Sequence, residues 1–183
     1  MNSLVDIYGS DRGRVLVCLL AHPTESFHLR GLARATSISP TWVSKTIKEF
    51  QRIGLVAITK DKEKNEVTIH PLHETSLFKA LKRVHMLYEL YASGLIDYLA
   101  EKYHQPACIV FFGSAARGED TEESDLDIAV ITSRKGIVLS LQSYEKKLHR
   151  SITIKELHKE TLTKEFKNTL ANGIVVSGYL DML

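Results

Sequence analysis

The chain has 183 residues, 44% of them hydrophobic and 25% charged, with a formal net charge of +2. This much apolar material excludes a disordered chain. The longest apolar runs, 15–21 and 107–112, are far shorter than the roughly 20 residues that a membrane-spanning helix needs. The N-terminus lacks the basic and apolar pattern of a secretory signal, so we expect a cytoplasmic protein without membrane association. Both cysteines, Cys18 and Cys108, lie in apolar runs and are expected to be buried thiols rather than a disulfide.

The net charge conceals an uneven distribution along the chain. Residues 106–131 carry six acids and one base, Arg117, whereas the segments on either side are neutral or basic. Divalent cations need acids and phosphates need bases, so this pattern suits a metal and nucleotide site flanked by surfaces that attract polyanions. An uneven surface charge without such a role is the alternative.

The first third of the chain predicts three short helices. A broad apolar face indicates a helix over residues 11–20. A second helix follows Ser26, a candidate N-cap residue, with apolar side chains at three- and four-residue spacing. The third helix has Pro40 at its first position and ends near Ile53, where a glycine follows.

The outward face of the third helix combines hydroxyl, cationic and aromatic groups, a combination that suits contact with DNA. The candidate DNA-binding residues on this helix are Thr41, Trp42, Ser44, Lys45 and Lys48. Beyond it, the runs 55–59 and 66–70 flank a polar turn and predict a β-hairpin.

The order of elements over residues 10–71 resembles the winged helix-turn-helix domain of bacterial and archaeal transcription regulators. The order is two helices, a turn, a third helix and a charged hairpin. The resemblance implies that the third helix enters the major groove of DNA and that the hairpin, or wing, lies along the backbone. A module that binds only protein is the alternative, because acids in the wing weaken its attraction for phosphate. The wing bases are Lys60, Lys62 and Lys64, and the acids are Asp61, Glu63 and Glu66.

Residues 73–104 predict a helical connection, in which Gly94 bends or divides the helix. We expect its apolar stripe to pack on its own domain, with pairing of two such helices in a homodimer as the alternative. The stripe consists of Leu77, Leu81, Val84, Tyr88, Tyr91, Leu95 and Leu99.

The most specific stretch is 107–132, which predicts a buried strand, a Gly-Ser turn, a polar loop and a second strand. At the turn, Gly113 permits close approach of a phosphate to the backbone, and the hydroxyl of Ser114 can contact it. A short helix is expected from Ala115, and Arg117 adds a positive charge. This turn is therefore a candidate nucleotide-binding site, together with Ser124 at the end of the loop.

Asp125 and Asp127 follow the loop and alternate in an extended strand, which directs both carboxylates to one side and Leu126 to the core. Two hard oxygen ligands of this kind can bind Mg²⁺ together with substrate phosphates. A pair of such ions can assist an in-line phosphoryl displacement. Asp125 and Asp127 are accordingly the candidate metal ligands and catalytic residues.

The spacing of these residues resembles the signature of the DNA polymerase β-like nucleotidyltransferase superfamily. It consists of Gly113-Ser114, ten intervening residues and then Asp125-Leu126-Asp127. The Ala-Arg-Gly at 116–118 is similar to its minimal branch. The resemblance implies a small mixed sheet with helices on one side, Mg²⁺ or Mn²⁺ on the two aspartates, and Ser114 on the triphosphate. It also implies transfer of a nucleoside monophosphate from a nucleoside triphosphate, with ATP as the expected substrate.

Active members of this superfamily usually have a third carboxylate on a later strand. After an expected helix over 138–150, Thr153 in the strand 151–155 occupies this position, and threonine cannot be a general base. Glu156 is the nearest acid, but it should share a face with Ile152 and Ile154 instead. A helix over 162–170 and a strand over 174–177 should complete the domain. The loop acids Glu119, Asp120, Glu122 and Glu123 are expected to be solvated.

The sequence thus predicts an α+β protein with a winged helix-turn-helix over 1–72, a helical connection over 73–105 and a minimal nucleotidyltransferase domain over 106–183. The leading hypothesis is an Mg²⁺-dependent nucleotidyltransferase coupled to DNA binding. The resemblance leaves open whether the acceptor is a protein hydroxyl, as in antitoxins that add AMP to a helical toxin-like partner, a nucleic-acid end or a small molecule. The alternatives are a non-catalytic transcription regulator that senses nucleotide and a module that only covers a protein partner.

Overall fold

The computed structural model describes residues 9–61, 66–134, 136–158 and 162–181. The chain divides into two compact units, Met1–Leu81 and Lys82–Leu183. Each has its own hydrophobic core. No helix among the described residues has the length and apolar character needed to cross a bilayer.

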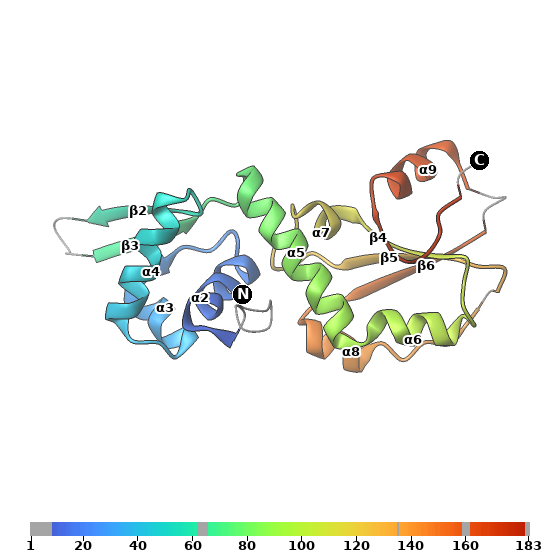
Figure 1. Cartoon of the computed structure of the whole chain (residues 1–183), viewed down its shortest axis with the longest axis horizontal. Helices are drawn as coiled ribbons and strands as arrows, with labels where there is room; N and C mark the ends of the chain where they lie inside the picture. Colours follow the sequence, from blue (N-terminus) through green and yellow to red (C-terminus); the bar gives the residue numbers. More distant parts are fainter. Residues whose placement is uncertain (1–8, 62–65, 135, 159–161, 182–183) are drawn as a thin grey trace. The chain divides into compact units, whose positions relative to one another are not determined.

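In the described part of the N-terminal unit, helices α2, α3 and α4 are combined with a small antiparallel sheet (Figure 1). The strand order is β1-β3-β2, and both pairings are antiparallel. This is the predicted winged helix-turn-helix arrangement, with β2 and β3 as the wing. The elements are α2 (Asp11–Ala21), β1 (Phe27–His28), α3 (Leu29–Thr36), α4 (Pro40–Arg52), β2 (Val56–Asp61) and β3 (Glu66–Pro71).

Capping residues explain where two of these helices begin. The hydroxyl of Ser10 accepts a hydrogen bond from the backbone N–H of Gly13 at the start of α2. Ser39 caps α4 in the same way, and Pro40 follows at the first helical position as predicted. The expected cap at Ser26 is wrong, because the chain first enters β1 and the Ser26 hydroxyl instead contacts Nδ1 of His70 at 2.9 Å.

The apolar faces predicted for these helices pack with the wing strands in one cluster, in which Leu16, Cys18 and Leu29 are only partly buried. The DNA-binding residues predicted on α4 lie outside this core, on the other side of the helix. The fully buried members of the cluster include Val15, Leu19, Leu32, Val43 and Ile69.

The predicted helical connection is two helices, α5 (Ser76–Ser93) and α6 (Leu95–Lys102). Gly94 divides them with φ +80°, a backbone conformation that glycine adopts without steric cost. The stripe predicted for α5 is wrong in part, because Leu77, Val84 and Tyr91 are exposed. The buried side of α5 follows a four-residue spacing instead, through Phe78, Lys82 and Leu90.

The C-terminal unit is built on a four-stranded mixed sheet with the order β6-β5-β4-β7. Strands β5 and β6 are parallel, and the other neighbours are antiparallel. The mixed sheet predicted from the resemblance is therefore confirmed. The elements are β4 (Cys108–Phe112), α7 (Gly113–Arg117), β5 (Leu126–Ile131), α8 (Gln142–Leu148), β6 (Ile152–Leu157), α9 (Lys164–Ala171) and β7 (Ile174–Gly178).

Alternation along the strands gives this sheet two different faces. Ile109, Phe111 and Leu126 lie on one face and pack with residues of α5, α6 and α8. On the opposite face, Val110 and Phe112 pack with Leu170 of α9, so we call it the α9 face. The expectation of helices on one side only is thus wrong, since α9 packs on the second face next to β4.

Two predicted helices differ in extent from those in the structure. Helix α7 begins at Gly113 rather than at Ala115. The helix expected over 138–150 is reduced to α8, which has seven residues. Backbone N–H groups before α8 are taken by distant side chains, because Gly136 and Ile137 donate to Glu156 and Ser140 donates to Tyr98. These hydrogen bonds satisfy the backbone of the segment before α8 and hold it against the rest of the unit.

Candidate functional site

Asp127 lies directly against the Gly-Ser turn that connects β4 to α7. Its Cα pairs with that of Phe112 across the antiparallel β4 and β5. The carboxylate rests on Gly113, so close that a Cβ at this glycine would overlap Asp127 Oδ2. Gly113 also has φ +82°, which favours glycine. The predicted metal ligand and the predicted phosphate-binding turn are therefore one place in the fold.

Burial and nearby charges shift the pKa of Asp127. Burial raises the pKa of Asp127, and the neighbouring Asp125 raises it further, while Lys155 opposes this rise. Asp125 is exposed just before β5, and Leu126 between them is fully buried on the opposite face, as the alternation predicts. A carboxylate whose charge is destabilised by burial and by a neighbouring acid provides a favourable environment for a cation.

The other residues predicted to contact nucleotide differ in their exposure and in their hydrogen bonds. Ser114 lies half-buried in the first turn of α7. Arg117 is exposed, and its Nε donates to Glu119 Oε2 at 2.7 Å, so its charge is partly compensated. The hydroxyl of Ser124 accepts a hydrogen bond from the N–H of Thr121 at 2.9 Å, which stabilises the turn before Asp125.

The prediction of a fully solvated acidic loop is wrong for Asp120, whose side chain is 3% exposed. Asp120 Oδ1 accepts from Lys82 Nζ at 2.8 Å, and Oδ2 accepts from Arg150 Nη2 at 3.1 Å. Arg150 Nη1 also donates to the carbonyl oxygens of Thr121 and Ser124, the latter at 3.0 Å. We call Lys82, Asp120 and Arg150 the buried ion cluster. It fixes the loop up to the residue that precedes Asp125.

Thr153 lies where the third carboxylate was expected. In the parallel pair of β5 and β6, Thr153 is the register partner of Asp127. Its hydroxyl donates a hydrogen bond to Asp125 Oδ2 at 2.7 Å. The position is therefore beside both aspartates, but it carries a neutral donor.

Glu156 does not replace this acid. Its carboxylate accepts hydrogen bonds from Tyr103 Oη at 2.8 Å and from the N–H groups of Gly136 and Ile137. Burial would raise the pKa of Glu156, but these hydrogen bonds hold the pKa below its ordinary value. Glu156 thus anchors the segment before α8, on the sheet face away from the aspartates.

Lys155 and two aromatic rings extend the α9 face beside the aspartates. Lys155 lies two residues after Thr153 in β6 and therefore projects from the same face of the sheet. Its Nζ is 5.4 Å from the ring centroid of Phe112 and 5.4 Å from that of Phe166 in α9. No sequence motif marks Lys155 as a site residue, although its two-residue spacing from Thr153 places both side chains on one face of β6.

Four of the candidate DNA-binding residues, Thr41, Ser44, Lys45 and Lys48, line a hollow of about 530 Å³ on α4 together with Leu29 and Pro40. Trp42 is 40% exposed, and Lys60 is exposed in β2. Lys62 and Lys64 of the wing lie outside the described residues.

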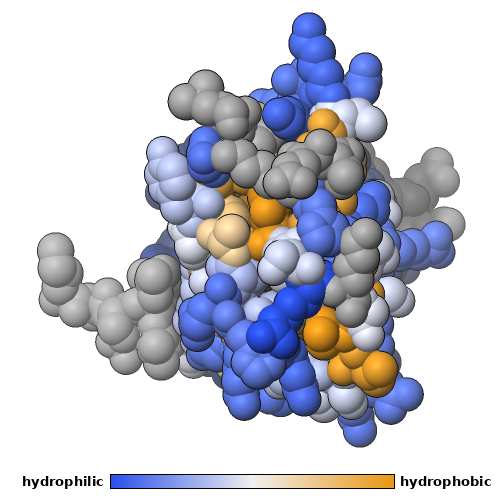
Figure 2. All heavy atoms as spheres, turned by 90° about the vertical axis from the view of Figure 1, so that its right-hand side faces the viewer, coloured by the Kyte–Doolittle hydropathy of each residue, from blue (hydrophilic) through white to orange (hydrophobic). Residues whose placement is uncertain are grey.

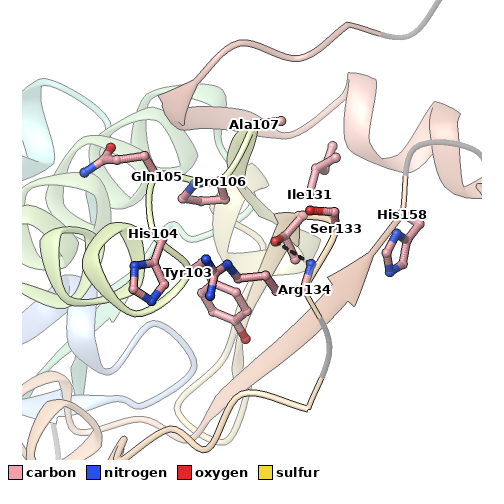
Figure 3. A pocket seen from close by; sticks show the side chains of 10 residues that line it. Tyr103, His104, Gln105, Pro106, Ala107, Ile131, Ser133, Arg134 and His158 are labelled. Carbon is pink, nitrogen blue, oxygen red and sulfur yellow. Dashed lines mark hydrogen bonds between the residues drawn. The ribbon is translucent and has the colours of Figure 1, made fainter.

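A larger hollow of about 610 Å³ lies at the opposite end of the C-terminal sheet from Gly113. It adjoins Ala107 before β4 and Ile131 at the end of β5, and Figure 3 shows His104, Arg134 and His158 around it. None of the residues predicted to bind metal or nucleotide lines it. Figure 2 shows an end of the C-terminal unit where hydrophilic residues predominate and apolar side chains form small groups.

A comparison with known protein families finds a match for most of the C-terminal unit. Residues 95–178 match the family model described as Polymerase beta, Nucleotidyltransferase. The matched segment contains the Gly-Ser turn, both aspartates and Thr153. No curated protein matches the chain. One solved structure, of MepR, a transcription regulator of the Staphylococcus aureus multidrug efflux pump MepA, is 18% identical with a TM-score of 0.31 and covers 50% of this chain and 78% of its own.

Proposed function

We propose that the C-terminal unit binds a nucleoside triphosphate with Mg²⁺ and transfers its nucleoside monophosphate to an acceptor hydroxyl. The observation that carries this proposal is the packing of the Asp127 carboxylate on Gly113. It unites a cation ligand with the turn that contacts phosphate. The family match over residues 95–178 supports the same activity, and the GS-x10-DxD spacing supports the minimal branch of the superfamily.

The residues of the site have separate tasks in this proposal. Gly113 lets the triphosphate approach the backbone, and the Ser114 hydroxyl donates to a phosphate oxygen. Asp125 and Asp127 would hold Mg²⁺, which fits their hard oxygen atoms and the unfavourable proximity of their charges. A bound Mg²⁺ supplies stabilisation of the charge that develops on phosphate oxygens during displacement. Arg117 and Lys155 add positive charge for the departing pyrophosphate.

The test is a pyrophosphate-release assay with Mg²⁺ and ATP, combined with transfer of label from the α-phosphate to candidate acceptors. We expect wild-type protein to release pyrophosphate and Asp125→Asn to lose this activity. Glu123→Gln, which alters an exposed acid of the same loop, is the matched control and should retain it. Equal release by wild type and Asp125→Asn would contradict the assignment.

The N-terminal unit supports a second part of the proposal, binding of double-stranded DNA through α4 and the wing. The hollow beside Thr41, Ser44, Lys45 and Lys48 offers hydroxyl and cationic groups on a helix that a winged helix-turn-helix places in the major groove. DNA binding would bring the nucleotide site under control of a promoter or place it near nucleic acid. Cytoplasmic location and a helical toxin-like acceptor belong to the same proposal.

A regulator without turnover is the second candidate, and Thr153 favours it. A threonine cannot accept the proton of an attacking hydroxyl at neutral pH. The site would then bind nucleotide and alter DNA affinity. In this case Mg²⁺ and ATP would change the dissociation constant for DNA, with no release of pyrophosphate for any acceptor. Release of pyrophosphate that depends on Asp125 would exclude this candidate.

A further inference from the structure

We propose that this site binds one divalent cation per nucleotide rather than a pair, with Lys155 supplying the additional positive charge toward the phosphates. The inference rests on the proposed function and specifies its metal content. It comes from the side chains that β5 and β6 bring to the α9 face.

The strands supply too few carboxylates for a pair of ions. Among the residues of β4, β5, β6 and β7, the carboxylates are Asp127 and Glu156, and Asp125 adjoins β5. Glu156 lies on the opposite face and is held by Tyr103 and two backbone N–H groups. Asp125 and Asp127 together carry two negative charges, which a single divalent ion already neutralises.

Thr153 occupies the position beside the two aspartates where a third carboxylate would lie. It is the register partner of Asp127, and its hydroxyl points at Asp125 Oδ2 from 2.7 Å. One of the four carboxylate oxygens thus already accepts a hydrogen bond. Another anionic ligand at this position would favour a second ion held between phosphate and protein, and this neutral donor provides none.

Lys155 makes a second ion still less favourable. It projects from the same face as Thr153, and its ammonium group stands over the rings of Phe112 and Phe166. Phe112 directly precedes the Gly-Ser turn, so the ammonium lies over the residue that leads into the phosphate-binding turn. A fixed positive charge here repels a second cation and attracts the triphosphate.

The experiment counts metal ions and nucleotides retained together. Full-length protein is dialysed against Mn²⁺ and an ATP analogue with a methylene group between the α- and β-phosphates, which prevents transfer. We expect one Mn²⁺ per retained analogue for wild type. Thr153→Asp should raise this ratio toward two, because it adds the missing anionic ligand. Thr153→Asn, which has similar size and no charge, should leave the ratio at one and serves as the folding control.

A second pair of variants tests Lys155. Lys155→Gln should weaken retention of the analogue about tenfold without changing the ratio of metal to nucleotide, and Lys155→Arg should retain most of the affinity. Unchanged retention in Lys155→Gln would overturn the role of the lysine.

The remaining outcomes separate the two proposals. Two Mn²⁺ ions per analogue in wild type would overturn the single-ion inference while leaving the proposed function intact. A ratio that stays at one in folded Thr153→Asp would overturn the part assigned to residue 153. No retention of analogue above the level of Asp127→Asn would overturn the proposed function and the single-ion inference together.

Discussion

The Thr153 hydroxyl donates a hydrogen bond to Asp125 Oδ2 across two parallel strands, at 2.7 Å. It links the position expected for a third acid to one of the two remaining carboxylates. The hydrogen bond orients Asp125, but it contributes no negative charge to a cation and no base to a proton transfer. In the proposed function, the site therefore keeps two carboxylates for a metal and nucleotide, but it has no third acid for catalysis.

Gly113 should be intolerant of any side chain. Gly113→Ala places a Cβ onto Asp127 Oδ2 at a positive φ, so we expect a loss of about 1–3 kcal/mol in the free energy of unfolding and loss of metal-dependent nucleotide binding. Urea unfolding and calorimetric titration measure the two effects. Gly31→Ala is the matched control, because no atom obstructs a Cβ there and alanine favours a helix by about 0.5–1 kcal/mol. Normal nucleotide binding by Gly113→Ala would contradict the close packing of Asp127 on the turn.

Asp127→Asn should make the metal-free protein more stable at neutral pH. Burial raises the pKa of Asp127, so its ionised form is less favourable in the folded than in the unfolded chain. This destabilisation is present above the raised pKa and disappears as the pH falls through it toward the ordinary value of 3.8. Urea unfolding across this pH range should show a difference between wild type and variant that fades in acid.

The same pair of proteins provides a ligand control. Mg²⁺ with ATP should raise the unfolding temperature of wild type by binding the folded state, and it should leave that of Asp127→Asn unchanged. The stability prediction itself would be contradicted if Asp127→Asn were less stable than wild type at neutral pH. That result would show that the Asp127 carboxylate makes a net favourable contact in the folded protein.

The buried ion cluster should dominate the stability of the loop before Asp125. Asp120→Asn removes the negative charge that the buried Lys82 and Arg150 share, so we expect a loss of about 3–5 kcal/mol in the free energy of unfolding. Glu123→Gln, in the exposed part of the loop, should change it by less than about 0.5 kcal/mol. Combining Asp120→Asn with Lys82→Met should cost less than the sum of the two single changes. Additive losses would show that the two side chains do not interact in solution.

The basic face of α4 should give a salt-dependent affinity for DNA. Lys45→Ala removes a cation beside the hollow on this helix, and each lost phosphate contact should reduce the slope of log K against log salt by about 1. Electrophoretic mobility shifts at several salt concentrations measure this slope. Lys146→Ala, an exposed change in α8, removes the same charge from the other unit and should leave the slope unchanged. Equal slopes for wild type and Lys45→Ala would contradict this interface.

Much of the fold follows from local signals in the sequence. Ser39-Pro40 marks the start of α4, Gly94 separates α5 from α6, and alternation around Leu126 places the aspartates on one face. These features depend on residues close together in the chain, so a single sequence is sufficient to predict them. The DNA-binding and nucleotide-binding roles and the domain limits of 72 and 105 remain predictions.

The failures arise where distant residues compete for the same groups. Asp120 lies in an acidic loop, and only the meeting of residues 82, 120 and 150 explains why its charge is buried. The segment before α8 is not the expected helix, and hydrogen bonds from the N–H groups of Ile137 and Ser140 to Glu156 and Tyr98 hold it against distant parts of the fold. Hydrophobic periodicity carries no information about such long-range hydrogen bonds.

The most direct measurement is a calorimetric titration of Mg²⁺ and ATP into wild-type protein and the Asp125→Asn/Asp127→Asn double variant. Wild type should bind the nucleotide only when the divalent ion is present, and the double variant should show no binding under the same conditions. Equal binding by both proteins, or no binding by the wild type, would contradict a nucleotide site built on Gly113 and the two aspartates.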